Sequence, residues 1–233
     1  MSVADNLRSV YEEIEKAKRE AGRNDDVTLV AVTKYSTPEE VLEAARAGQT
    51  VFAENRVQML REKWAAFDTM RENGEDIPEM HWHLIGQLQT NKVKYVVGRV
   101  ELIHSCDREQ LADEISVQSV RRSLVTDVLI EVNVSGEESK SGVSPSGLEE
   151  LLRHCAALPG IRVRGLMTMA PLGADEDELT RIFTETKKLF IDMNMKKIYN
   201  QPMTTLSMGM SADFACAVRC GATMIRVGRK IFS

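Results

Sequence analysis

The sequence predicts an α/β fold: a single (β/α)8 barrel of the TIM type that fills one domain, residues 1–233, with an extra helix at its N-terminus. Short apolar runs rich in β-branched residues alternate with amphipathic stretches eight times, and no linker or low-complexity segment interrupts them. Eight such units in about 200 to 250 residues are typical of a closed barrel. An open doubly wound sheet is the alternative, because strand closure leaves no mark in a single sequence.

The bulk composition indicates an ordinary soluble protein. Of the 233 residues, 43% are hydrophobic and 28% are charged, and the formal net charge is -5. This acidic balance gives no reason to expect nucleic acid or an anionic membrane as a partner. No apolar run reaches the length of a membrane span, and the first ten residues lack the basic and apolar regions of a signal peptide. We therefore expect a cytoplasmic protein, and we expect it to be a monomer.

The four cysteines predict neither a disulfide framework nor a metal site, because they are few and scattered in a chain of this length. Cys216 and Cys220 share a helical face at a spacing that also suits metal ligands, but no histidine lies near them in the sequence. We expect buried thiols at both positions.

The N-terminal region is predicted to form a helix followed by a strand. Apolar residues recur at helical spacing over residues 3–21, and Gly22 follows in the place of a C-cap. Residues 27–34, "VTLVAVTK", are apolar almost throughout and rich in β-branched side chains. That composition is typical of a strand in a parallel sheet covered by helices.

The next segment, "TPEEVLEAARAG", carries the signals of a helix. Thr37 suits the N-cap and Pro38 the first turn, Glu40 closes a capping box, and Gly48 ends the helix. The same order of strand and helix continues along the chain. Further strands are expected at residues 51–54, 81–85, 100–104, 126–134, 161–168, 203–206 and 223–227. Further helices are expected at about 55–72, 90–98, 107–120, 144–157, 175–194 and 211–220.

Lys34 is the first candidate functional residue. Barrel enzymes place their chemistry at the carboxyl ends of the strands, and Lys34 ends the first strand just before a loop that starts with Tyr35. One interpretation is structural: the stem of the lysine covers the barrel rim while its ammonium group reaches water. The other is functional, because an amine in a partly desolvated mouth is a nucleophile toward carbonyl compounds. This segment alone favours the structural interpretation.

A candidate phosphate site follows in "TLSMGMSADFACAVRCGATMIRVGRK". The seventh strand ends at Ser207 to Ser211, with Gly209 between them and Ser211 in place to be the N-cap of the next helix. The eighth strand ends at Gly228. Loops after strands seven and eight commonly hold phosphate, because backbone N–H groups and a helix N-terminus converge there. Small residues also occur in ordinary turns, so the motif is moderately specific.

Arg226 is the third candidate, because it lies in "MIRVG" two residues before the end of the eighth strand and is expected to face the barrel interior or its mouth. A salt bridge to an inward carboxylate such as Glu54 or Glu131 would explain it structurally. A nucleophilic lysine, a phosphate site and an arginine around one mouth suit a ligand that carries both an aldehyde and a phosphate. Pyridoxal 5'-phosphate (PLP) is such a ligand.

Several segments in this order resemble the pyridoxal phosphate homeostasis protein family, whose barrel is related to the alanine racemase N-terminal domain and has the PLP-binding architecture called fold type III. The likeness extends from about Val27 to Phe232. It is carried by "AVTKYSTPEEVLEAARAGQTVFAENRVQ", "HWHLIGQLQTNK", "EVNVSGEESKSGV", "GLMTMAP", "LSMGMSADF" and "MIRVGRKIF".

The resemblance implies a role for each part of the mouth. Lys34 would bind the cofactor covalently as a Schiff base. Ser207 would hold the phosphate, helped by backbone N–H groups around Gly209, Gly228 and Arg229.

The resemblance also implies contacts around the cofactor ring. Arg226 would face the pyridine nitrogen, and Asn55 would lie near the ring. His83 and Met167 lie on strands that would line the site, although the alternating "HWH" pattern could equally place His83 in the core.

Two positions depart from the family pattern. Ala53 stands where the family typically has glycine, so the turn before Asn55 is expected to be less permissive. Arg229 follows the last glycine where the family often has serine or threonine. Its guanidinium group could contact the phosphate, or its backbone N–H could serve alone.

Three functions are consistent with these residues. The resemblance implies a PLP carrier in intracellular PLP homeostasis without robust turnover, with PLP-dependent apoenzymes as transient partners. The alternative is a PLP-dependent enzyme such as a weak amino-acid racemase, for which Tyr35 is a poor base because it shares the loop of Lys34. A cofactor-free aldolase that uses Lys34 is the third.

Overall fold

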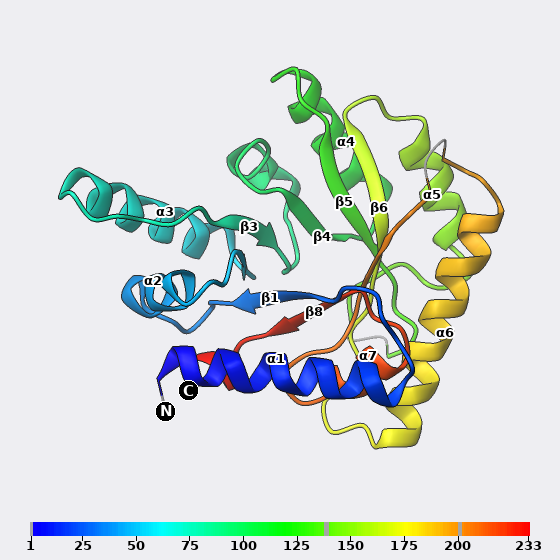
Figure 1. The fold of residues 1–233 in the computed structure, drawn as a ribbon. Coiled ribbons are helices and arrows are strands. Elements are labelled where there is room, and N and C mark those ends of the chain that lie inside the picture. The colour runs from blue at the N-terminus through cyan, green and yellow to red at the C-terminus, as the bar shows by residue number, and fades with distance from the viewer. Residues whose placement is uncertain (1, 138–139, 200–201) are drawn as a thin grey trace.

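The strands form a closed barrel in the computed structural model, which describes residues 2–137, 140–199 and 202–233 (Figure 1). Each strand pairs in parallel with its neighbours in chain order, and β8 pairs with β1. The open-sheet alternative is therefore wrong. The strands are β1 (Thr28–Val32), β2 (Val51–Glu54), β3 (His81–Leu84), β4 (Leu102–Cys106), β5 (Thr126–Glu131), β6 (Ile161–Met167), β7 (Thr205–Ser207) and β8 (Met224–Val227).

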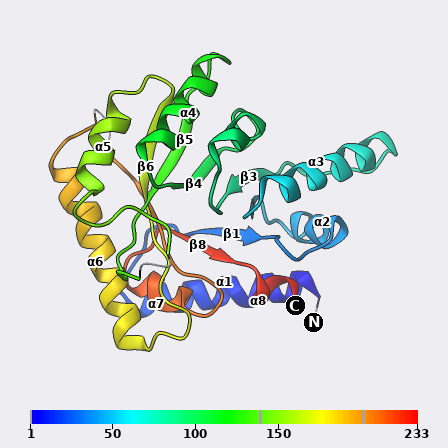
Figure 2. The same ribbon diagram turned by 180° about the vertical axis from the view of Figure 1, so that it is seen from behind.

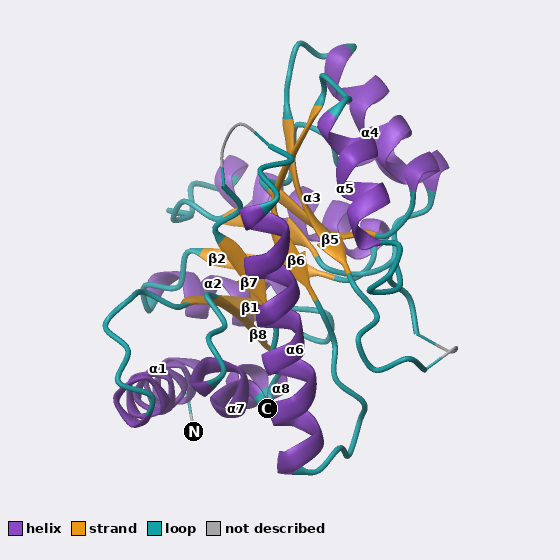
Figure 3. Ribbon diagram, turned by 90° about the vertical axis from the view of Figure 1, so that its right-hand side faces the viewer, coloured by secondary structure: helices purple, strands orange, loops and turns teal. Residues whose placement is uncertain are grey.

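Helices surround the barrel, and α6 lies across the outside of the strands in Figure 3. They are α1 (Val3–Glu20), α2 (Pro38–Arg46), α3 (Val57–Glu72), the 3-10 helix η1 (Thr90–Tyr95), α4 (Glu109–Val120), α5 (Leu148–Ala156), α6 (Glu176–Met195), α7 (Phe214–Arg219) and α8 (Arg229–Phe232). The predicted start of α2 is confirmed: Thr37 and Glu40 form a capping box, and Gly48 adopts a φ of 99° after the helix. None of the helices within the described residues combines the length and apolar character that a bilayer span requires.

Some predicted boundaries were wrong. The helix expected over 211–220 begins only at Phe214, and Ser211 lies in the turn before it instead of capping it. The side chain of Asp213 holds this turn together by accepting a hydrogen bond from the backbone N–H of Met210. The segment expected to be helical over 90–98 forms the shorter η1, which bends the chain back to β4.

The extra N-terminal helix α1 packs outside the barrel against α7 and α8, and the two chain ends lie close together (Figures 1 and 2). The Asn6 side chain of α1 donates a hydrogen bond to the carbonyl oxygen of Ile231 at 3.0 Å. This bond ties α1 to the segment that follows β8, and so to one side of the barrel mouth.

The barrel interior contains an apolar group of residues and, toward the mouth, polar ones. The apolar group consists of Val30, Ala53, Leu102, Leu129, Met167 and Met224. Ala53 is thus an ordinary interior strand residue, and the chain makes no turn at it that a glycine would ease. The polar side chains on the mouth side are those around Arg226, which is paired in register with Val30.

The cysteines behave largely as predicted. Cys216 is buried and Cys220 half-buried, and their thiols lie beside Thr180 and Thr184 of α6. Among the residues that the structure describes, no group of three histidine, cysteine or acidic side chains is arranged to hold a metal ion.

Candidate functional site

A cavity of about 390 Å³ opens at the carboxyl ends of the strands, which is the predicted place for a site. Lys34 enters it from the end of β1, Asn55 from the end of β2 and Arg226 from β8. The chain after β8 contributes Gly228 and Arg229. Its apolar walls include Ile85, Met169 and Leu172.

Lys34 presents its amine at this mouth. The residue is exposed, and no carboxylate of the described chain forms an ion pair with it. Its Nζ lies 5.1 Å from the centre of the Tyr35 ring, which is 84% exposed and is not part of the cavity wall. The amine is therefore free to meet a ligand in the cavity.

The loops after β7 and β8 form an anion site beside this lysine. The backbone N–H of Gly228 donates to Ser211 Oγ at 3.2 Å, which joins the two loops. Several backbone N–H groups in these loops have no hydrogen-bond acceptor among the described residues, and those of Ser211, Ala212 and Arg229 belong to residues that line the cavity. Unpaired N–H groups gathered at one edge favour an anionic group such as phosphate.

Arg226 is held in place by hydrogen bonds to residues of the barrel interior, below this anion site. Its guanidinium donates to Ser207 Oγ at 2.5 Å and to the carbonyl oxygen of Thr168 at 2.9 Å. Burial lowers the pKa of Arg226 to about 10, so the side chain remains a cation at neutral pH. The structural alternative, a salt bridge to Glu54 or Glu131, is not formed, because within the described chain neither carboxylate lies within ion-pair distance of Arg226. Neutral oxygens hold the guanidinium instead.

A directed chain of hydrogen bonds continues from Arg226 into the barrel. Ser207 Oγ lies 3.2 Å from His104 Nδ1, and His104 Nε2 lies 3.0 Å from His83 Nδ1. Arg226 can only donate to Ser207, and within the described chain His104 Nδ1 is the remaining hydrogen-bond partner of the serine hydroxyl, so the hydroxyl proton is donated to Nδ1. The proton of His104 is then on Nε2 and is donated to His83.

Both histidines in this chain are neutral at neutral pH. Burial, with His81 as a smaller cause, lowers the pKa of His83 to about 4. Burial also brings the pKa of His104 well below its usual range, and the nearby His83 and Arg226 add to this shift. The chain thus supplies Arg226 with an acceptor without neutralising its charge.

Glu131 faces the same cavity from the end of β5 and is 3% exposed. Burial, with a smaller contribution from nearby Asp107, raises its pKa to about 7, although Arg226 partly opposes the shift. Asp213, another cavity residue, also has a pKa raised by burial. The cavity wall therefore carries three basic side chains, those of Lys34, Arg226 and Arg229, against the two carboxyl groups of Glu131 and Asp213.

We expect Glu131→Gln to change how stability depends on pH. Between about pH 4.5 and about pH 7 the folded protein keeps a proton on Glu131 that the unfolded chain releases, so this group loses stability as the pH rises through that window. The free energy of unfolding of the variant, relative to the parent, should rise by about 3 kcal/mol from pH 4 to pH 8. Urea unfolding at both pH values measures this difference.

The control is Glu39→Gln, at an exposed position of α2, which should show no such trend. Every other titrating group is common to parent and variant and cancels in the comparison. A constant difference between Glu131→Gln and its parent across this range would contradict the buried, protonated state of Glu131.

The structure brings together only part of the predicted site. The predicted residues that line the cavity are Lys34, Asn55, Arg226, Gly228 and Arg229. Those that do not line it are His83, Met167, Ser207 and Gly209. His83, Met167 and Ser207 point into the barrel interior one layer below the cavity floor, and Gly209 packs against Phe214 and Ala217. These four residues are therefore outside the lining of this cavity, and their contact with a ligand stays a prediction.

The sequence reasoning missed cavity residues that the structure supplies. Ser211 carries the hydroxyl at the anion site, although the sequence predicted only a helix cap there. Asp213 and Met169 were not considered as cavity residues. The position of each serine relative to the end of β7 could have identified Ser211. Ser211 follows the strand and so belongs to the loop at the mouth, whereas Ser207 is still within the strand.

The fold and the mouth together define a class of protein, the barrel domain found in alanine racemases. The family model described as "Alanine racemase, N-terminal domain" matches residues 6–233. Within this class the chain belongs to the pyridoxal phosphate homeostasis protein family. It is 41% identical over 233 residues to the Pyridoxal phosphate homeostasis protein of Aquifex aeolicus (strain VF5), covering 100% of this chain and 98% of the relative. It is 36% identical to that of Escherichia coli (strain K12), covering 99% and 95%.

Solved structures agree with this assignment. PipY of Synechococcus elongatus PCC7942, solved with PLP bound, superposes with a TM-score of 0.85 at 31% identity and covers all of both chains. The alanine racemase of Corynebacterium glutamicum shares the fold, with a TM-score of 0.67 at 17% identity over 98% of this chain and 59% of the racemase.

Proposed function

We propose that this protein binds PLP with Lys34 as its covalent anchor. The observation that carries the proposal is that one cavity contains both an unpaired lysine amine and a set of free backbone N–H groups at the loops after β7 and β8. PLP, when bound, supplies an aldehyde that condenses reversibly with a primary amine, and a phosphate that needs anion-binding groups. A relative of this chain, PipY, was solved with PLP bound.

The residues present fit this group. A volume of about 390 Å³ lies within the usual range for small-ligand cavities, about 300 to 1,000 Å³. Ser211 and the N–H of Arg229 would hold the phosphate, while Ile85 and Met169 supply apolar surface for the ring. Arg226 would face the pyridine nitrogen and Asn55 would lie near the ring. The hydrogen-bond chain through Ser207 keeps the guanidinium in place.

We further propose that the protein acts in PLP homeostasis as a cytoplasmic monomer that passes the cofactor to apoenzymes, with little turnover of its own. The names of its curated relatives support this role. So does the cavity: a racemase needs a second base across the ring from its lysine, and no tyrosine of the described chain is among the residues that line the wall.

Solvent exchange tests this role. Incubating the PLP-loaded protein with each amino acid in deuterated water should give no α-proton exchange at an enzyme-like rate. Cofactor should nevertheless reach an apoenzyme, measured by recovery of that enzyme's activity. Rapid stereospecific exchange would instead assign the protein to the racemases.

Ser211→Ala should weaken the binding of PLP by about 1 to 3 kcal/mol while leaving pyridoxal, which lacks the phosphate, almost unaffected. The reason is that the Ser211 hydroxyl lies at the anion site. Ser207→Ala should weaken both ligands by a similar factor, because Ser207 acts through Arg226. Spectroscopic titration of each variant with both aldehydes gives the two ratios. If Ser207→Ala weakened the binding of PLP but not that of pyridoxal, the result would show that Ser207 contacts the phosphate.

A further inference from the structure

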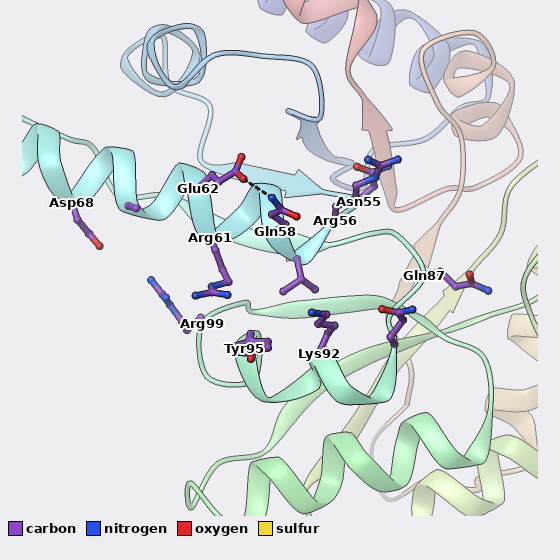
Figure 4. A pocket seen from close by; sticks show the side chains of 13 residues that line it. Asn55, Arg56, Gln58, Arg61, Glu62, Asp68, Gln87, Lys92, Tyr95 and Arg99 are labelled. Carbon is purple, nitrogen blue, oxygen red and sulfur yellow. Dashed lines mark hydrogen bonds between the residues drawn. The ribbon is translucent and has the colours of Figure 1, made fainter.

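A second hollow lies beside the cofactor cavity, between α3 and η1 (Figure 4). We call it the α3–η1 groove; its volume is about 760 Å³. In Figure 4, Arg61 on α3 extends toward the η1 side, and Lys92 and Tyr95 on η1 lie across from it. Arg56 and Arg99 complete its set of cations.

The cations of this groove are unusual for an acidic protein because they are unpaired. Most lysines and arginines elsewhere in the described chain form ion pairs, as Arg71 does with Asp68. Within the same described ranges, neither ion pairs nor hydrogen bonds engage the groove's basic side chains, which are Arg56, Arg61, Lys92 and Arg99. Charges within about 8 to 10 Å of one another in physiological salt act on a ligand together. The groove therefore attracts a group with several negative charges.

The acidic residues of the groove do not cancel this charge. Glu62 accepts a hydrogen bond from the Gln58 side chain at 2.9 Å, which lies on the same helix. Asp68 at the far end is paired with Arg71. Four cations thus face two carboxylates, of which Asp68 is already paired with a cation, so the groove keeps a net positive charge.

Aromatic rings hold the cations in position. The Arg61 guanidinium lies 4.8 Å and the Lys92 amine 5.8 Å from the centre of the half-buried Tyr95 ring, and Arg99 lies 4.0 Å from that of Trp64. Such contacts orient a cation without neutralising it. The groove is therefore a prearranged anion-binding surface, not a set of freely moving side chains.

The groove meets the cofactor cavity directly. Asn55 and Gln87 line both hollows. A chain bound in the groove would therefore lie at the edge of the mouth through which the cofactor enters and leaves.

From these observations we infer that the α3–η1 groove binds an acidic segment of a protein partner, an extended stretch rich in aspartate and glutamate. The groove is too large for a single phosphate, and the Gln89 amide, together with the remaining hydrogen-bonding capacity of the Gln58 amide, can bond a peptide backbone. Nucleic acid fits less well, because single-stranded nucleic acid stacks its bases on aromatic side chains, and among the described lining residues the groove offers only the half-buried Tyr95 ring. If the proposed function holds, on which this identification rests, the partner is a cofactor-accepting apoenzyme.

The test compares two double variants of the PLP-loaded protein. The first, Arg61→Glu with Lys92→Glu, reverses the charge at two positions of the groove. The second, Arg19→Glu with Lys188→Glu, makes the same change in net charge at exposed positions on α1 and α6. The probe is a fluorescein-labelled peptide of ten glutamates, followed by anisotropy. We expect the groove variant to bind it about tenfold or more weakly, and the control within about twofold of the parent. An unlabelled peptide should also slow cofactor transfer to an apo-aminotransferase from the parent but not from the groove variant.

Equal binding of the peptide to the parent and the groove variant would overturn the inference. So would tighter binding of a twelve-residue thymidine oligonucleotide than of the peptide. The cofactor absorption band is recorded first for every variant, so that this result can be distinguished from a failure of the proposed function. A parent protein that does not bind PLP would contradict the proposed function. A PLP-loaded groove variant that binds the peptide as the parent does would contradict only the inference about the groove. Arg61→Ala with Lys92→Ala serves as a second groove variant if charge reversal impairs folding.

Discussion

Lys34→Ala is expected to abolish covalent retention of PLP. The parent should be yellow and keep its absorption band through dialysis, whereas the variant should lose the band and keep only phosphate-dependent binding. Because the amine at the cavity mouth is the one group placed for covalent attachment within the described cavity wall, the Kd should rise at least about 100-fold, equivalent to about 2.7 kcal/mol. Absorption spectra before and after dialysis, with titration of the apo forms, measure both effects.

Lys230→Ala is the matched control, because this lysine lies on α8 close to the same loops but is paired with Glu13 on α1. It should retain the band. Borohydride reduction followed by peptide mass mapping should place the pyridoxyl group on Lys34. Finding it on Lys230, or on Lys140 in the loop after β5, would show that another amine anchors the cofactor. A colourless parent that takes up no PLP would favour the cofactor-free aldolase.

Lys63→Met is expected to cost about 3 to 5 kcal/mol of folding free energy, the largest stability effect we predict. Lys63 of α3 lies 2.7 Å from Glu54 at the end of β2, and both side chains are almost completely buried. Thr33 also donates to the same Glu54 oxygen at 2.6 Å, while the other carboxylate oxygen has no partner within the described structure. Removing the lysine leaves a buried carboxylate without its counter-ion. Urea unfolding of parent and variant measures the loss.

The double variant Glu54→Leu with Lys63→Met tests whether the loss of stability comes from the unpaired buried charge. Replacing both partners by apolar side chains removes the unpaired charge, so most of the lost stability should return. The position matters for function because Glu54 immediately precedes Asn55 at the cavity. We therefore expect the single variant to load PLP less well than the double variant. A single variant within about 1 kcal/mol of the parent would show that the site relaxes or admits water.

Local rules were sufficient for much of the fold. The capping box of Thr37 and Glu40 was predictable because it depends on residues three apart in one turn. The rule that barrel chemistry lies at the carboxyl ends of strands singled out Lys34 and Arg226, and both line the cavity at the mouth. Family resemblance narrowed the ligand to PLP, since no spacing rule distinguishes it from a phosphorylated sugar.

Depth inside the barrel could not be predicted from the sequence. Ser207 and His83 point into the barrel interior and do not line the cavity, because a side chain two residues earlier on a strand lies one layer deeper. Their contact with a ligand stays a prediction. Ser211 was read as a helix cap because its sequence context suits one, yet Asp213 forms the turn and leaves the Ser211 hydroxyl to the anion site.

The sequence by itself determined the alternation of strands and helices, the lysine at the end of the first strand and the membership of a PLP-binding family. Those properties depend on periodicity, on caps and on residues close together along the chain. Only the tertiary structure decided that β8 closes on β1, which serine faces the cavity, and that Ser207, His104 and His83 hold Arg226. It also showed the unpaired cations of the α3–η1 groove. The physical reason is that these features depend on contacts between separate elements, whose register and depth are set when the barrel closes and its interior packs.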